Sequence, residues 1–256
     1  MLTSRDGTTW QPARIITHDL AGVSAVQAAS GPGGYVIAGK VVEPSGACLA
    51  DVWWSRDLKS WTKAHDVNPA SGSAQALAVA AGPSGFASAG SYEGKPAVWT
   101  TSDGLAWSTV SLPLPAGASA GVVQQVAISG SRVVALGQQT TADGTRPLAE
   151  RSADGGRTWQ PVPFAAPGPG VAFTALTVGL GGFTAAAQFD SAAGGLDAAV
   201  WTSADGGTWT RSPVSGLTGG SHDLTALAVS GGAVTGVDSV QAQASRQFVL
   251  RRLPAG

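Results

Sequence analysis

Ser152-Ala-Asp154-Gly-Gly-Arg-Thr-Trp159 is one of five copies of a short motif, and these copies decide the fold. The motif, called the Asp motif below, has Ser or Thr two residues before an Asp and Trp four or five residues after it. The copies span 4–10, 55–61, 101–107, 152–159 and 203–209, with aspartates 51, 46, 51 and 51 residues apart. A period near 50 residues without a helix-length apolar stripe predicts a repeated all-β unit.

Each period divides into four short runs that we expect to be strands. The first run is small and apolar, at Val23–Ala29, Gln75–Ala81, Val122–Ile128, Phe173–Val178 and Leu224–Val229. Gly, Pro and Ser then form a turn to the second run, as a tight hairpin requires. A longer loop leads to the third run, and the Asp motif turns the chain into the fourth. Four antiparallel strands repeated radially predict a β-propeller that occupies residues 1–256 as a single domain.

The Asp motif has a structural explanation of its own. Its carboxylate can accept backbone N–H groups inside the hairpin, and the glycine after it supplies a positive φ. Its tryptophan begins the outgoing strand and should pack between sheets. We therefore assign structural roles to Asp6, Trp10, Asp57, Trp61, Asp103, Trp107, Asp154, Trp159, Asp205 and Trp209.

These segments resemble the Asp-box (BNR) repeat, S-x-D-x-G-x-T-W, of sialidase-like propellers. Only Ser152–Trp159 matches in full; the other four copies have Asp and Trp one residue closer together, and Leu58 follows Asp57 where the repeat has glycine. The resemblance covers all five repeats and implies the fold. It says little about chemistry, because one fold hosts many functions.

The ends of the chain bear on the number of blades. The chain begins within an Asp motif, and Gln247–Leu253 is a third-type run that no Asp motif follows. If Trp10–Ile16 pairs with Gln247–Leu253, five four-stranded blades close into a ring without exposed sheet edges. The alternative is a fragment of a six- or seven-bladed propeller.

Composition excludes several classes of function. The 256 residues carry 15 Lys and Arg against 16 Asp and Glu, a net charge of −1, without a basic cluster. We therefore expect no nucleic-acid partner. The single cysteine, Cys48, excludes an intrachain disulfide and a cysteine-based zinc site.

No membrane insertion is expected. The uncharged stretch Thr158–Phe189 contains four prolines and Gly181-Gly182, which do not suit a membrane helix. Met1–Gly7 has no apolar core of a signal peptide. The compartment stays open, although the fold resemblance favours the extracellular space or the cell envelope.

The candidate site residues lie in loops that should share one face of the propeller. Second-to-third-strand loops carry Glu43, Glu93, Asp190 and Asp238, and fourth-to-first connections carry His18, His65 and His222. Such residues could face a cation or a basic partner on an acidic surface. The plainer alternative is that loops are polar in any protein.

A sialidase-like or other glycosidase activity is the catalytic alternative. The resemblance implies an arginine trio, a Phe-Arg-Ile-Pro segment and a Tyr/Glu pair, but this chain has Ala13-Arg14-Ile15-Ile16 and only two tyrosines. Glycosidases need two facing carboxyl groups, and the five first runs contain no charged residue. We therefore assign no catalytic residue.

The sequence favours a monomeric, non-catalytic binding or scaffold propeller without a cofactor. Its acidic loop face would bind a small ligand, a glycan or a protein, with a bound cation as one option. A structural fragment of a larger surface protein is a further alternative, which a ring left open would favour.

Overall fold

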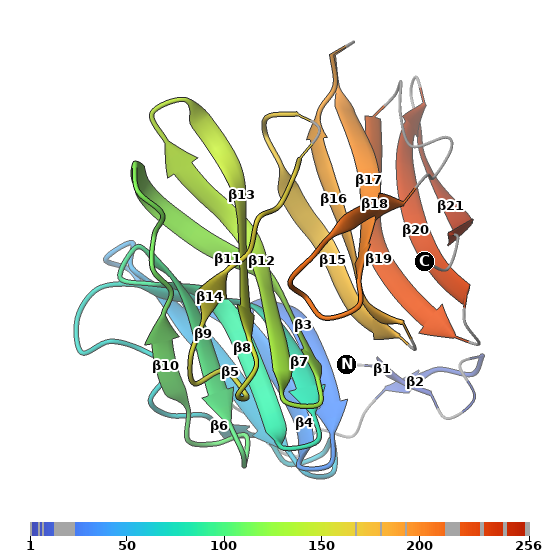
Figure 1. The fold of residues 1–256 in the computed structure, drawn as a ribbon. Coiled ribbons are helices and arrows are strands. Elements are labelled where there is room, and N and C mark those ends of the chain that lie inside the picture. Colours follow the sequence, from blue (N-terminus) through green and yellow to red (C-terminus); the bar gives the residue numbers. More distant parts are fainter. Residues whose placement is uncertain are drawn as a thin grey trace.

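The computed structural model describes residues 2–4, 6, 8–12, 24–166, 168–179, 181–192, 194–212, 221–230, 233–242 and 245–253. They form an all-β protein of antiparallel sheets in which chain order is also sheet order (Figure 1). No helix within these ranges is long and apolar enough to cross a membrane. The predicted all-β propeller architecture is therefore confirmed, and the uncharged stretch 158–189 contributes strands.

The first three sheets have four strands each. Sheet 1 contains β3 (Ser24–Gly31), β4 (Gly34–Val42), β5 (Cys48–Ser55) and β6 (Thr62–Lys63). Sheet 2 contains β7 (Ala74–Gly82), β8 (Gly85–Tyr92), β9 (Lys95–Thr101) and β10 (Ser108–Ser111). Sheet 3 contains β11 (Ala118–Ser129), β12 (Arg132–Thr141), β13 (Gly144–Ser152) and β14 (Gln160–Pro161).

The remaining sheets differ in size. Sheet 4 contains β15 (Ala172–Gly179), β16 (Gly182–Asp190), β17 (Leu196–Ser203) and β18 (Thr210–Ser212). Sheet 5 has three described strands, β19 (Ser221–Ser230), β20 (Ala233–Ala242) and β21 (Ser245–Leu253). A separate hairpin consists of β1 (Leu2–Thr3) and β2 (Gln11–Pro12).

Every first strand carries a β-bulge at the same place. The extra residue is Val26, Leu77, Gln124, Thr174 or Thr225. A bulge bends the strand and increases its twist, which suits strands that curve around a propeller axis. Two of these bulges also join neighbouring sheets: Gln124 Oε1 accepts the N–H of Phe173, and Thr174 donates to the carbonyl of Leu224.

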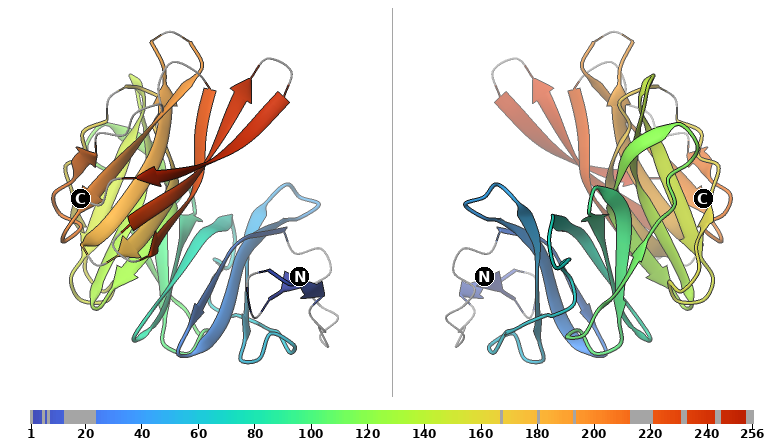
Figure 2. Two further views of the ribbon diagram at one scale, coloured as in Figure 1. Left: turned by 90° about the vertical axis from the view of Figure 1, so that its right-hand side faces the viewer. Right: turned by 90° about the vertical axis from the view of Figure 1, so that its left-hand side faces the viewer.

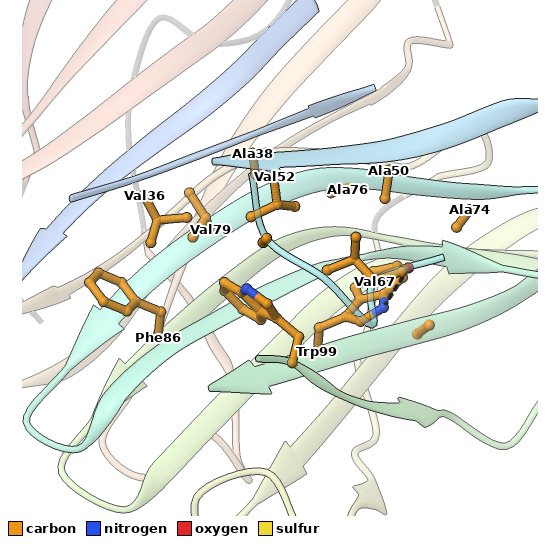
Figure 3. Close-up of a cluster of buried hydrophobic side chains, with 13 residues drawn as sticks. Val36, Ala38, Ala50, Val52, Val67, Ala74, Ala76, Val79, Phe86 and Trp99 are labelled. Atoms are coloured by element: carbon orange, nitrogen blue, oxygen red, sulfur yellow. Dashed lines mark hydrogen bonds between the residues drawn. The ribbon is translucent and has the colours of Figure 1, made fainter. Parts of the chain in front are cut away.

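The core lies between the sheets. First strands contact one another in the order β3, β7, β11, β15 and β19, so that the sheets fan out side by side (Figure 2). Between sheets 1 and 2, Val36 and Val52 face Phe86 and Trp99 (Figure 3). Equivalent apolar clusters fill the spaces between sheets 2 and 3, 3 and 4, and 4 and 5.

The predicted closure is not formed by the described residues. Gln11 and Pro12 pair with Thr3 and Leu2, and β20 is the strand that pairs with β21 among the described elements. Residues 13–16 lie outside the described ranges. Within those ranges β19 does not contact β3 as the other first strands contact their neighbours. Pairing across one Asp motif closes a far shorter loop than pairing with β21, which favours the local hairpin.

Candidate functional site

The Asp motifs form the turns that the sequence predicts. In the hairpin between β9 and β10, Asp103 Oδ1 accepts the backbone N–H groups of Leu105 and Ala106 at 2.8 and 3.0 Å. Thr101 Oγ1 donates to the same carboxylate and accepts the N–H of Gly104. Asp6, Asp57, Asp154 and Asp205 each accept two backbone N–H groups in the same way.

These hydrogen bonds fix the charge state of the motif aspartates. Backbone N–H donors hold the pKa of Asp103 below its ordinary value, because they stabilise the ionised form. In Asp154 the Thr158 hydroxyl has the largest effect, and the pKa is again lowered. The motif carboxylates are thus anionic at neutral pH and are occupied by their own turns.

The motif tryptophans close the hairpins from the side, with one exception. The indole N–H of Trp107 donates to Gly104 O at 3.1 Å, and its ring is buried between sheets 1 and 2. Trp61, Trp159 and Trp209 make the same local bond. Trp10 differs: 57% of it is exposed, so the expectation that it packs between sheets is wrong.

Three of the predicted ligand-binding acids are exposed at strand connections, as expected. Glu43 lies between β4 and β5, and Glu93 lies in the two-residue turn between β8 and β9, with φ of +50°. Asp190 ends β16 beside Gly170. In antiparallel meanders these connections share one rim, opposite the Asp motifs. The name acidic rim is used below for Glu43, Glu93 and Asp190.

His222 and Asp238 do not belong to this rim, which corrects the sequence interpretation. Both lie within strands, β19 and β20, rather than in loops. His222 Nδ1 is 3.0 Å from Asp238 Oδ2, and both residues are buried. Each polar group is placed in the interior because the other satisfies it.

The other two histidines differ in outcome: the structure places His65 and does not describe His18. His65 is exposed with Nδ1 2.6 Å from Asp66 Oδ2, and its backbone N–H donates to Leu105 O. Leu105 belongs to the Asp motif of sheet 2, so His65 lies toward the opposite rim. His18 lies outside the described residues.

The described part of the chain contains no group of three or more His, Cys, Asp or Glu side chains able to hold a metal ion. The acids of the acidic rim come from sheets 1, 2 and 4 rather than gathering at one point. Such spacing suits contacts with an extended partner better than chelation of an ion, which needs several oxygens around one centre.

Sequence reasoning missed one chemically unusual residue, Glu150. It lies on β13, opposite Ala135 and Pro161, and is 1% exposed. Neither carboxyl oxygen has a hydrogen-bond partner among the described residues, and burial raises the pKa of Glu150 to about 7. A signal existed: counting back from the Ser or Thr of each Asp motif, sheets 1, 2 and 4 have Trp53, Trp99 and Trp201 at this position.

Comparisons with known proteins identify the fold and no more. No protein-family model matches the sequence, and no curated protein sequence does. Among solved structures, YCF48 bound to D1 peptide has a TM-score of 0.55 at 15% identity, covering 93% of this chain and 68% of that one.

Two enzymes share the same architecture. Trypanosoma rangeli sialidase in complex with the inhibitor DANA has a TM-score of 0.57 at 13% identity, covering 88% of this chain and 54% of its own. The GH74 xyloglucanase from Xanthomonas campestris has a TM-score of 0.62 at 16% identity, and the match covers 98% of this chain and 40% of the xyloglucanase. This chain spans about half the length of these two enzymes. It has a β-propeller fold similar to that of sialidases and other propeller proteins.

Proposed function

We propose that this chain is a non-catalytic binding propeller whose acidic rim takes a basic, extended partner such as a Lys- and Arg-rich protein segment. The repeats are, on this proposal, Asp-box repeats used as scaffold. The observation that carries it is the exposure of Glu43, Glu93 and Asp190 on one rim, where none of the three has an ion-pair partner among the described residues.

The distribution of charge supports recognition of a cationic partner. Most other acidic side chains already have partners within the protein. The motif aspartates accept hydrogen bonds from their own turns, Asp51 pairs with Lys63 at 2.9 Å, and Asp238 lies beside His222. Opposite charge steers a partner toward the rim and sets the orientation of the encounter. Because three sheets each contribute one acid, the partner must reach across several blades. A flexible basic segment meets that requirement.

The described residues give glycoside hydrolysis less support. That reaction needs two carboxyl groups about 5–10 Å apart on either side of the bond. The inner strands β3, β7, β11 and β15 contain no charged residue. Glu150 has a pKa suited to a general acid, but it is buried between sheets where no substrate reaches it. YCF48, which has a similar fold, is bound to a peptide in its solved structure, and this agrees with the binding alternative.

Fluorescence polarisation with a labelled nonapeptide of alternating Lys and Ser tests the proposal. We expect saturable binding that weakens as salt is raised from 50 to about 300 mM, because the contacts are solvent-exposed charge pairs. The triple variant Glu43→Gln, Glu93→Gln, Asp190→Asn should weaken binding about tenfold or more and leave the unfolding midpoint nearly unchanged.

The double variant Arg56→Gln, Lys59→Gln is the matched control, since it changes exposed charges on the opposite rim. It should bind the peptide as well as the unmodified chain does. Equal binding by the triple variant, or no saturable binding at low salt, would refute the acidic rim as the site.

A further inference from the structure

One position in the repeat distinguishes the junctions between sheets. The residue immediately before the Ser or Thr of each Asp motif is Trp54 in sheet 1, Thr100 in sheet 2 and Arg151 in sheet 3. Each side chain lies against a glycine in the Asp motif of the following sheet: Trp54 against Gly104 and Thr100 against Gly156, each three residues before the motif Trp, and Arg151 against Gly207, two residues before it. The same repeat position thus faces the next Asp motif at all three junctions, and the junctions differ in the size and charge of the side chain there.

At the junction of sheets 1 and 2 the space is filled by an indole. The Trp54 ring lies so close to Gly104 that a Cβ there would collide with it. The indole Nε1 donates to Gly33 O at 2.9 Å, which fixes the ring against the turn between β3 and β4. This accounts for Trp54, which occupies a repeat position where the other sheets have no tryptophan.

At the junction of sheets 3 and 4 the space is filled by a guanidinium. Arg151 lies against Gly207, and its Nη1 is 3.1 Å from Asp205 Oδ2. The preceding sheet thus supplies a cation to the Asp motif of sheet 4. The backbone N–H of Gly207 does most to hold the pKa of Asp205 below its ordinary value, and the charge of Arg151 adds to this effect.

At the junction of sheets 2 and 3 the space is open. Thr100 is too short to cover the Asp motif of sheet 3, although its Cγ2 would be 2.7 Å from a Cβ on Gly156. A hollow of about 430 Å³ remains between the turn from β7 to β8, the turn from β11 to β12 and the two Asp motifs. This space is called the Thr100 hollow below.

The lining of the Thr100 hollow is rich in unused hydrogen-bonding groups. Six of the lining residues carry a hydroxyl or a guanidinium that makes no side-chain hydrogen bond within the described part of the chain: Ser84, Thr100, Ser102, Ser108, Ser131 and Arg157. Asp154 also lines the hollow, but its carboxylate already accepts from Thr158 and from the Arg157 backbone. The Arg157 guanidinium is thus the free charged group.

We propose that the Thr100 hollow binds a small saccharide carrying one carboxylate, with Arg157 on the carboxylate and the serine and threonine hydroxyls on the sugar hydroxyls. A guanidinium presents a planar fork that matches a carboxylate. Hydroxyls both donate and accept, so they match sugar hydroxyls in either sense. The volume lies within the range of small-molecule sites. The site is on the rim opposite the acidic rim and does not depend on it.

Two-dimensional amide NMR with glucuronate as the probe, and with glucose and acetate as comparators, tests the inference. Glucuronate should shift the amides of Ser84, Ser102, Ser131 and Arg157 saturably at millimolar concentration. Glucose and acetate should each bind at least tenfold more weakly, since each supplies half of the recognised groups.

Two variants locate the site. Thr100→Trp copies the filling residue of the neighbouring junction and should abolish the glucuronate shifts. Arg157→Gln should reduce glucuronate binding to the level of glucose, whereas Arg56→Gln, an exposed arginine of another Asp motif, should have no effect. The inference is overturned if glucuronate gives no saturable shift here, if Thr100→Trp folds and binds normally, or if acetate or glucose binds as well as glucuronate.

Discussion

Replacing the buried Glu150 by Gln should stabilise the protein, but only at pH values at which the carboxyl group would otherwise ionise. Glutamine has nearly the same shape, so the packing between sheets 2 and 3 is preserved. What changes is the need to keep a carboxyl group protonated in a site where the described residues offer neither oxygen a hydrogen-bond partner. The unfolded chain loses that proton near the ordinary pKa of 4.5, whereas the folded chain keeps it up to about 7.

The sign and size of the effect follow from this difference. Between pH 4.5 and 7 the native state binds more protons than the unfolded state, so the contribution of Glu150 to stability falls as the pH rises. At about 1.4 kcal/mol for each pKa unit, the loss reaches at most ~3 kcal/mol above pH 7. For a chain of this size that corresponds to roughly 6–12 °C in the unfolding midpoint.

Thermal unfolding followed by circular dichroism at pH 4.5, 6 and 8 provides the measurement. The midpoint difference between Glu150→Gln and the unmodified chain should be near zero at pH 4.5 and largest at pH 8. Glu93→Gln, which removes an exposed carboxylate, is the control and should show no such trend. A midpoint difference that is the same at all three pH values would refute the conclusion that burial raises the pKa of Glu150.

Three further predictions concern the scaffold, each measured as an unfolding free energy or midpoint. Gly85→Ala should cost more than ~3 kcal/mol, because Gly85 has φ of +136° and a Cβ would collide with a carbonyl oxygen; Gly94→Ala, with φ of +76° and open space, should cost only ~1–2 kcal/mol. Trp107→Ala should cost ~3–5 kcal/mol and Trp10→Ala less than ~1 kcal/mol, since Trp107 is 3% exposed and Trp10 is 57% exposed; equal losses would contradict this interpretation. Because the pKa of Asp103 is lowered from its ordinary value of 3.8, the ionised carboxylate stabilises the fold above about pH 4, and this contribution is lost as the pH falls below that value. Asp103→Asn should therefore make the unfolding midpoint depend less on pH below about pH 4.

The fold could be predicted because the repeat length of about 50 residues indicates a whole four-stranded sheet and not only a single strand. Asp and Trp at fixed spacing identify the hairpin between third and fourth strands, and the observed strands agree with the predicted runs to within a few residues. Ring closure could not be predicted in the same way. It depends on whether Gln11–Pro12 pairs with its sequence neighbour or with a strand more than 200 residues away, and no local pattern decides that.

The site was less predictable, because burial depends on partners distant in sequence. From the sequence, Asp238 is expected in a loop. The structure instead places it in the interior beside His222, which is 16 residues earlier in the chain. The Thr100 hollow is defined by a side chain that is small where Trp54 and Arg151 are large. Such a difference is visible only when equivalent positions of successive repeats are compared. The same comparison would have identified Glu150.

The order of the strands has a consequence for how the protein is made. Every described pairing joins strands that are consecutive in the chain, so each sheet can form as soon as its own fifty or so residues have left the ribosome. Its outer apolar face then waits for the next sheet to be synthesised. During that interval the apolar face of the most recently formed sheet is uncovered. We expect chaperones to bind this face, and we expect pauses in translation to promote aggregation through it.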